Sequence, residues 1–251
     1  MDLLPGVKAY IDGITFKSKI ENNAKIIKQE YVIGIQYPQV LVQPWPRGFS
    51  YQFEFFAGNH SPSLVKDQVF SSFEKAVEEH VLYIFSENLN QLIPAYRQLG
   101  YLHAWNNILM IKKISPNEKR FVPPGVKIKK ITTLQEVSMV NSIGPDNLSS
   151  TKGLENPAIH NLMAFYKDEV CAKAQMIILQ EKFAFLADIY THTNYRRKGI
   201  SNALLQEMHT LAAEAGVKYS VLIPSKMTRE FDLFQKHAYR TLVEVALLVP
   251  G

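Results

Sequence analysis

The chain has 251 residues, of which 47% are hydrophobic and 20% are charged, and it carries a formal net charge of +5. This balance excludes intrinsic disorder and fits a globular protein with a sizeable core, while the length allows one large domain or two small ones. A single cysteine, Cys171, excludes an internal disulfide framework and a multi-cysteine zinc site, and we expect no metal. Cys171 is interpreted as a small buried hydrophobic residue, with a nucleophile as the alternative.

Two features of the N-terminal part argue against export and membrane insertion. The first residues, Met1–Pro5, carry an acid where a secretory signal has basic residues. The longest uncharged stretch, Tyr31–Pro46, contains three prolines and falls short of the ~20 apolar residues that cross a bilayer. With the single cysteine, these features lead us to expect a cytoplasmic protein without a membrane partner.

A weak internal repeat appears when the sequence is shifted against itself by 138 residues. Residues 81–96 then align with 219–234 without a gap, and apolar residues coincide at pairs such as Ile84/Leu222 and Tyr96/Phe234. The same offset sets 50–56 over 188–194, and both segments look strand-like. Chance coincidence of apolar residues is the alternative. The repeat predicts two related domains, residues 1–116 and 126–251.

The segment between the two predicted domains is basic and rich in proline. Its basic residues flank Ser115-Pro-Asn and Pro123-Pro-Gly and are Lys112, Lys113, Lys119, Arg120, Lys127, Lys129 and Lys130. Proline and glycine interrupt helices and strands, so the composition predicts a solvated linker. The alternative, a nucleic-acid patch, lacks stacking aromatic residues and a helix-turn-helix pattern, and we expect no nucleic-acid partner.

In the second half, strand and helix patterns alternate. A capping box at Thr133 and Glu136 predicts the start of a helix, and residues 145–156 are expected to form a loop. Strands are predicted at 126–131, 162–166, 171–179, 183–192, 217–223 and 241–249, and helices at 199–215 and 228–237. This order predicts an α/β fold, or α+β, with a mixed sheet.

The turn between the predicted strand 183–192 and helix 199–215 carries the strongest functional signal. It contains Arg196, Arg197 and Lys198, followed by Gly199 directly before the helix. The free N–H groups at a helix N-terminus and the helix dipole both favour an anion, and Gly199 with the small Ser201 lets a ligand approach closely. The turn therefore predicts a pyrophosphate site, with an ordinary basic turn as the alternative.

These residues resemble the GNAT superfamily of acyl-CoA-dependent N-acetyltransferases. Tyr190–Ser201 is similar to the family's fourth strand and its (Arg/Gln)-x-x-Gly-x-(Gly/Ala) loop, and Phe234–Tyr239 to its later Tyr-x-x-x-Gly-Phe element. The resemblance spans 126–251. Residues 1–116 look like a degenerate copy of the same fold, because Gly58–Ser63 has no basic residues where the second half has the phosphate turn. The resemblance thus implies two tandem GNAT-like folds.

The resemblance also implies how acetyl-CoA is held. The backbone of the turn would bind the pyrophosphate, and the main chain of Ile189 and Thr191 would pair with the pantetheine arm. The implied cofactor-binding residues are Ile189, Thr191, Arg196, Arg197, Lys198, Gly199, Ile200, Ser201 and Phe234.

N-acetylation requires a neutral amine, and a lysine-like amine holds its proton with a pKa of about 10.4. Simple alternation puts Asp188, Tyr190 and His192 on one face of strand 183–192, although a bulge would change this. Asp188 or His192, acting directly or through water, is the candidate general base, with a structural role for each as the alternative. An oxyanion donor is expected at the backbone N–H of Ile189 or Thr191.

Three positions depart from the family pattern. Phe234 replaces a tyrosine proposed to protonate the leaving thiolate, so Tyr190, Tyr239 or water would supply that proton. Ala238 replaces a glycine that often adopts a left-handed conformation, at a cost of roughly 1 kcal/mol, and Thr193 replaces a proline.

The resulting hypothesis is an N-acetyltransferase that moves acetyl from acetyl-CoA to a primary amine on a small molecule or peptide, as a monomer or homodimer. The acceptor would lie between the 144–156 loop, the inter-domain face and strand 183–192. The alternative is a catalytically inactive acyl-CoA-binding module that acts as an interaction protein.

Overall fold

The computed structural model describes residues 3–43, 48–73, 79–118, 120–144, 150–179, 182–224 and 229–251, with only the backbone at 229 and 230. Parts of several predicted features lie outside these ranges: residues 44–46 of the uncharged stretch, Lys119 of the linker, 145–149 of the loop at 145–156, and Thr228 at a predicted helix start. Contacts divide the chain into two compact units. Unit 1 comprises Met1–Met110 and Ile223–Gly251, and unit 2 comprises Ile111–Leu222.

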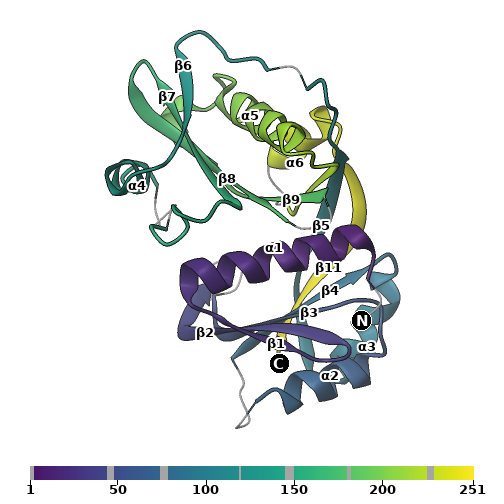
Figure 1. The fold of residues 1–251 in the computed structure, drawn as a ribbon. Helices are drawn as coiled ribbons and strands as arrows, with labels where there is room; N and C mark the ends of the chain where they lie inside the picture. The colour runs from purple at the N-terminus through teal and green to yellow at the C-terminus, as the bar shows by residue number, and fades with distance from the viewer. Residues whose placement is uncertain are drawn as a thin grey trace. The chain divides into compact units, whose positions relative to one another are not determined.

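Unit 1 is a mixed sheet with helices on both faces. In chain order its elements are α1 (Pro5–Asn22), β1 (Lys25–Lys28), β2 (Val32–Gln43), β3 (Phe49–Ala57), α2 (Pro62–Ser71), β4 (His80–Ser86), α3 (Leu89–Gln98), most of β5 (Tyr101–Lys113), α6 (Arg229–Lys236) and β11 (Arg240–Pro250). The strand order is β1-β2-β3-β4-β11-β5. β1, β2 and β3 are antiparallel neighbours, β3 and β4 run parallel, and β11 pairs antiparallel with β4. Figure 1 shows α1 on one face of these strands and α2 with α3 on the other.

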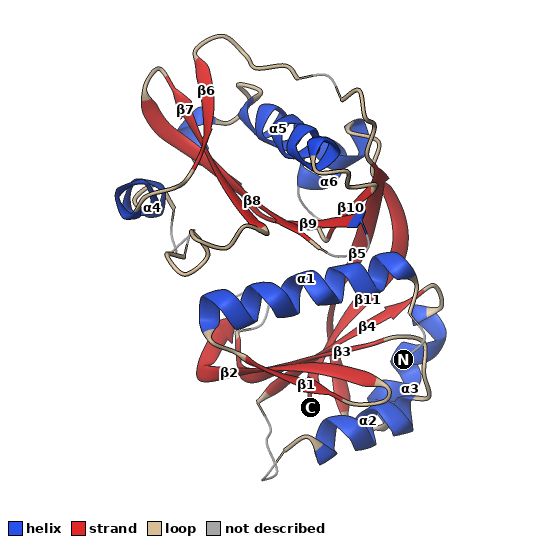
Figure 2. Cartoon of the chain, viewed as in Figure 1, coloured by secondary structure: helices blue, strands red, loops and turns tan. Residues whose placement is uncertain are grey.

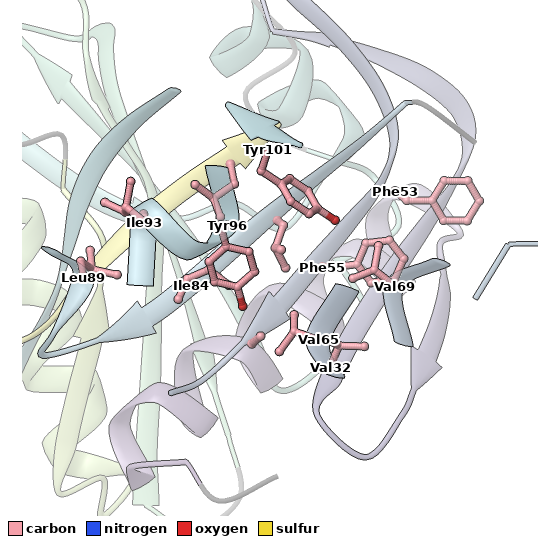
Figure 3. Packing of buried hydrophobic residues seen from close by; sticks show 14 residues of the cluster. Val32, Phe53, Phe55, Val65, Val69, Ile84, Leu89, Ile93, Tyr96 and Tyr101 are labelled. Atoms are coloured by element: carbon pink, nitrogen blue, oxygen red, sulfur yellow. The ribbon is translucent and has the colours of Figure 1, made fainter. Parts of the chain in front are cut away.

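The core of unit 1 lies between the strands and the α2–α3 side. Phe53 and Phe55 are stacked on β3, with ring centroids 6.2 Å apart, and pack in one cluster with Val65 and Val69 of α2. Figure 3 shows these side chains converging with Tyr96 of α3. Each fully buried side chain of this size contributes about 1.5–3 kcal/mol through the hydrophobic effect. Gly34 makes room for this packing, because a Cβ there would lie 2.7 Å from the Phe55 ring.

Unit 2 is a second mixed sheet with one helix on each face. Its elements are β6 (Val126–Lys130), α4 (Leu134–Asn141), β7 (Ile159–Tyr166), β8 (Glu169–Ile178), β9 (Phe183–Thr191), the 3-10 turn η2 (Thr193–Tyr195), α5 (Ile200–Glu214) and β10 (Tyr219–Leu222). The strand order is β10-β9-β8-β7-β6. β6 to β9 are antiparallel neighbours, and β9 and β10 run parallel. Figure 2 shows α5 and α4 on opposite sides of these strands.

The strands and helices predicted for the second half are present, with small differences in their bounds. The Thr133 hydroxyl accepts from the Glu136 N–H, and the Glu136 side chain accepts from the Thr133 N–H, so the capping box opens α4 as expected. The helix predicted over 199–215 is α5, preceded by Gly199 and followed by Gly216, and both glycines have positive φ. The fold class is therefore α/β with a large mixed sheet, as predicted from the alternating pattern and the family resemblance.

Both segments aligned by the internal repeat begin in a strand and end in a helix. Residues 81–96 begin in β4 and end in α3, and the described part of 219–234 begins in β10 and ends in α6. The predicted domains, 1–116 and 126–251, follow the order of the sequence, whereas residues 223–251 pack within unit 1. No helix in the described part of the chain is long and apolar enough to cross a membrane.

Candidate functional site

The site is built where β9 separates from its parallel neighbour. β9 and β10 are paired at Phe183, Ala184 and Phe185, yet β9 continues to Thr191. Among the described residues of unit 2, the edge of β9 that follows Phe185 therefore has no strand beside it on the β10 side. Unpaired strand edges offer alternating N–H and C=O groups to an extended ligand. This edge contains Ile189 and Thr191, the residues expected to bind the pantetheine arm.

A β-bulge interrupts β9 within this edge. Tyr190 pairs with Lys173 and Ala187 pairs with Gln175, so two residues of β9 lie opposite one residue of β8. Asp188 is in the bulge and has a φ of 50°. An extra residue reverses the alternation of the side chains that follow it. Simple alternation, which would put Asp188, Tyr190 and His192 on one face, is therefore wrong at this position.

Asp188 lies beside a buried lysine that no sequence pattern marks. The Nζ of Lys173 is 3.4 Å from the Oδ2 of Asp188, and the Lys173 side chain is 0% exposed while that of Asp188 is 34% exposed. A buried charge is costly unless an opposite charge or hydrogen bonds compensate it. Asp188 therefore has a structural partner in addition to its position at the open edge.

The other two predicted catalytic side chains are held by local hydrogen bonds. The Nδ1 of His192 accepts from the backbone N–H of Asn194 at 3.4 Å, which caps η2. A neutral imidazole that accepts at Nδ1 carries its proton on Nε2, so its basic nitrogen is engaged. The Tyr190 hydroxyl donates to the carbonyl of Ile143, 3.3 Å away, near the end of α4. Tyr190 thus fixes the chain that leads into the predicted acceptor loop.

The turn from β9 to α5 has the backbone geometry of an anion site. Arg197 and Gly199 both have left-handed φ values, 65° and 77°, with Gly199 as the N-cap of α5. The first backbone hydrogen bond of the helix runs from the Ala203 N–H to the Gly199 carbonyl at 3.0 Å. The N–H groups that precede Ala203 in the first turn have no acceptor within a helix, and they lie at the positive end of the helix dipole.

Side-chain contacts tie this turn to β9 and β7. The Nε of Arg196 donates to the Thr191 carbonyl at 3.1 Å, and the hydroxyls of Thr191 and Ser201 are 2.9 Å apart. The Nζ of Lys198 lies 4.3 Å from the centre of the Tyr166 ring. Cation–π contacts of this kind contribute about 0.5–1 kcal/mol at exposed sites. The structure therefore brings the end of β9, the basic turn and the start of α5 together, as predicted.

Gly199 is required for a reason that sequence reasoning missed. A Cβ on Gly199 would lie 2.9 Å from the Cγ of Pro123, so the proline ring occupies that side of the glycine. Pro123, rather than a ligand, therefore makes the close approach to this side of Gly199. Only a clustering of prolines near 123 could have hinted at it.

The predicted linker lies against α5. The Phe121 N–H donates to the Gln206 side chain at 2.9 Å, and Arg120 forms an ion pair with Glu207. The Nζ of Lys112 is 2.7 Å from the Oε1 of Glu118. Residues 120–122 are exposed, as expected of a solvated linker, but Arg120 and Phe121 also bind polar side chains of α5.

Three further predicted positions behave as follows. Phe234 lies on α6 in unit 1 and is buried against the Tyr239 ring. Ala238 has a φ of 62°, so the left-handed conformation expected at the replaced glycine is present.

Cys171 is buried, which raises the pKa of its thiol to about 11 and disfavours the reactive thiolate. In the described part of the chain, no three His, Cys, Asp or Glu side chains form a group suited to a metal.

Comparison with known proteins finds one matching family model and several solved structures with a similar fold. Residues 130–239 match the sequence model of the acetyltransferase (GNAT) family. A search of curated protein sequences finds no significant match. Among solved structures, the chain is similar to a GCN5-related N-acetyltransferase from Kribbella flavida, with a TM-score of 0.68 and 12% identity over 98% of this chain and 94% of that one.

Two other solved structures extend the likeness. A GCN5-related N-acetyltransferase from Sphaerobacter thermophilus has a TM-score of 0.57 and 13% identity, covering 88% of this chain and 82% of its own. A GNAT-family protein from Novosphingobium aromaticivorans has a TM-score of 0.55 and 11% identity, covering 98% and 97%. At these identities the likeness concerns the fold, and it extends over almost the whole chain.

Proposed function

Because residues 130–239 match the sequence model of the GNAT acetyltransferase family, we propose that the protein is an acyltransferase that moves an acetyl group from acetyl-CoA to a primary amine. One observation carries the proposal. The left-handed turn at Arg197–Gly199 follows the open edge of β9 after the short turn η2, so a phosphate site at the turn and a site for an extended chain at the edge would be continuous. CoA has this combination of a pyrophosphate and an extended pantetheine arm.

The residues at the turn fit such a ligand. The N–H groups at the start of α5 would bind the pyrophosphate, and Arg196, Arg197 and Lys198 would supply positive charge beside them. The main chain of Ile189 and Thr191 would hold the arm as an added strand. When bound, the thioester supplies an activated acyl group.

The chain must also remove a proton from the amine and stabilise negative charge on the acyl oxygen. Asp188 and His192 are the two candidates for proton removal, directly or through a water molecule. A backbone N–H of β9 at Ile189 or Thr191 would donate to the acyl oxygen. Tyr190 or water would supply a proton to the leaving sulfur, because Phe234 has no hydroxyl group.

A second candidate function is an acyl-CoA-binding module without turnover. Its support is the engagement of the two side chains that would move protons, since His192 caps η2 and Tyr190 donates to Ile143. Under this second proposal the protein binds acyl-CoA at the phosphate turn but does not catalyse acyl transfer.

We further propose that the protein acts in the cytoplasm, as a monomer or homodimer, without a nucleic-acid partner. The basic segment, for which a nucleic-acid patch was the alternative to a linker, contacts α5 through Arg120 and Phe121. The acceptor is proposed to be a small amine or a peptide.

The test combines binding with turnover. Acetyl-CoA is titrated into the protein by calorimetry, and thiol release is followed with a panel containing a polyamine, a lysine peptide and an aminoglycoside. We expect binding and amine-dependent thiol release, both lost in the double variant Arg196→Glu/Arg197→Glu. Unchanged transfer in that variant contradicts the proposal, and binding without transfer to any amine favours the second candidate.

A further inference from the structure

The ion pair between Lys173 and Asp188 joins two features of unit 2 that each cost folding free energy, a buried charge and a left-handed aspartate. Lys173 points from β8 into the protein with no exposed surface, and its Nζ is 3.4 Å from the Oδ2 of Asp188. Asp188 itself adopts a left-handed φ of 50°, a conformation that non-glycine residues rarely hold. A buried ammonium needs a counter-charge, and a left-handed aspartate needs an interaction that keeps it there.

The position of the pair connects it to the open edge. Lys173 is paired with Tyr190, the second residue after Asp188, so the lysine anchors both the backbone and the side chain of the bulged segment. A bulge turns the backbone groups that follow it. The orientation of the N–H groups from Ile189 to Thr191 therefore depends on how firmly Asp188 is held.

We infer that Lys173 is a positioning residue that fixes the bulge of β9 through Asp188 and so aims the backbone N–H groups of the open edge. This inference rests on the proposed acyltransferase function. It assigns Asp188 to the architecture of the site and leaves proton removal to His192 or water. Loss of a single oxyanion donor, or its displacement by about 1 Å, costs on the order of 100-fold in rate.

A glycine substitution separates this role from general-base catalysis. Glycine adopts left-handed φ without strain, so Asp188→Gly keeps the bulge without needing the lysine. The double variant Lys173→Met/Asp188→Gly also removes the buried charge. If Asp188 only holds the backbone, the double variant recovers the turnover lost in Lys173→Met. If Asp188 is the base, the double variant is at least as impaired as the single one.

The expected results for Lys173→Met follow from the same reasoning. Turnover of acetyl-CoA with the best amine of the panel falls by about 10- to 100-fold, while the affinity for CoA falls by a smaller factor, because the phosphate turn lies outside the pair and only the main-chain contacts of the pantetheine arm are disturbed. The pH–rate profile falls in height without moving along the pH axis. Were Lys173 to tune a catalytic carboxylate, its removal would instead shift the acid limb of the profile to higher pH.

The chain offers a matched control. Lys127 and Asp168 form a second pair, 2.7 Å apart, in which the aspartate also has a left-handed φ, here 68°. Both side chains are exposed, at 73% and 81%, and neither belongs to the open edge. We expect Lys127→Met and Lys127→Met/Asp168→Gly to leave turnover and CoA affinity unchanged.

A readout independent of turnover keeps the inference testable. In crystal structures of the variants, residue 188 should leave the left-handed region in Lys173→Met and return to it in the double variant, and the thermal midpoint should fall in the first and recover in the second. A left-handed Asp188 and normal turnover in Lys173→Met would overturn the inference. If wild-type protein binds acetyl-CoA without any thiol release, the proposed activity fails, while the backbone at residue 188 still decides whether Lys173 holds the bulge.

Discussion

Units 1 and 2 each contain a series of antiparallel strands followed by one parallel pair, and they differ where the parallel pair ends. In unit 1, β3 stays paired with β4 up to Ala57, its last residue, and α2 begins at Pro62. In unit 2, β9 continues beyond its last pair with β10 at Phe185, and α5 begins only at Ile200. The connection at 58–61 has no positive φ, whereas 192–199 has two.

This difference shows that the scaffold alone does not make the site. A phosphate turn requires enough chain between strand and helix to reach left-handed conformations and to aim free N–H groups at one point. An open strand edge requires the neighbouring strands to separate. Unit 2 meets both conditions and unit 1 meets neither, so CoA binding is expected in unit 2.

The largest effect expected from this comparison is on acetyl-CoA affinity. Arg197 in unit 2 and Asn59 in unit 1 are equivalent positions under the 138-residue offset. Arg197→Glu should weaken binding by at least about 100-fold, or about 2.7 kcal/mol, since it replaces attraction to the pyrophosphate by repulsion. Asn59→Glu should leave the affinity unchanged. Calorimetric titration of both variants checks this, and equal losses would mean that unit 1 also contributes to binding.

The next effect concerns stability at the turn. Gly199→Ala should cost about 2 kcal/mol, because alanine is strained at positive φ and its Cβ would press on Pro123. Gly100 in unit 1 also has positive φ, but a Cβ there would have no other atom within 4 Å, so Gly100→Ala should cost only about 1 kcal/mol. Urea unfolding measures both values. Equal costs would show that the Pro123 contact adds nothing.

A smaller difference between the two units is expected at the helix caps. The Lys129 ammonium and the N–H groups of Thr132 and Thr133 lower the pKa of Glu136 from 4.5 to about 2. Because the pKa is lower in the folded state, this stabilisation is present above pH 4.5 and is lost as the pH falls toward 2. Glu136→Gln should remove that pH dependence of the thermal midpoint.

Unit 1 provides the control for the cap. Thr133→Ala should cost about 1 kcal/mol, whereas Ser61→Ala at the start of α2 should cost only a few tenths, since the Ser61 side chain makes no capping hydrogen bond. Thermal unfolding of both variants at pH 7 measures the difference. A similar cost for both would contradict it.

The smallest effect is expected at another pair of equivalent positions. The Tyr96 hydroxyl in unit 1 is buried with no hydrogen-bond partner among the described residues, and burial raises its pKa. Tyr96→Phe should therefore stabilise the protein by about 0.5 kcal/mol. Phe234→Tyr, which would bury a hydroxyl at the equivalent position, should destabilise it. A loss of stability in Tyr96→Phe would indicate an unrecognised partner for the hydroxyl.

Local features of the fold were predictable because they depend on neighbouring residues. The capping box at Thr133, the glycines that flank α5 and the basic turn follow from short-range rules and were confirmed. The repeat aligned β4–α3 with β10–α6, but its extension backwards failed: residues 50–56 lie inside β3, while 188–194 cross the end of β9 into η2. An alignment without gaps cannot represent the longer connection between strand and helix in unit 2.

Features that depend on distant residues were not predictable. A lysine in a strand is usually taken as solvent-facing, so nothing local marks Lys173 as buried beside Asp188. The contact between Pro123 and Gly199 joins residues far apart in the sequence. The same holds for residues 223–251, whose place in unit 1 depends on pairing between β11 and β4.

The position of β11 has a consequence for biosynthesis. This strand lies between β4 and β5 in unit 1, although it is made after every residue of unit 2. Domains usually fold in the order of translation, the N-terminal one first. Here all strands of unit 2 are made before unit 1 receives β11. During translation, the second unit can therefore begin to fold while the first unit still lacks the strand between β4 and β5.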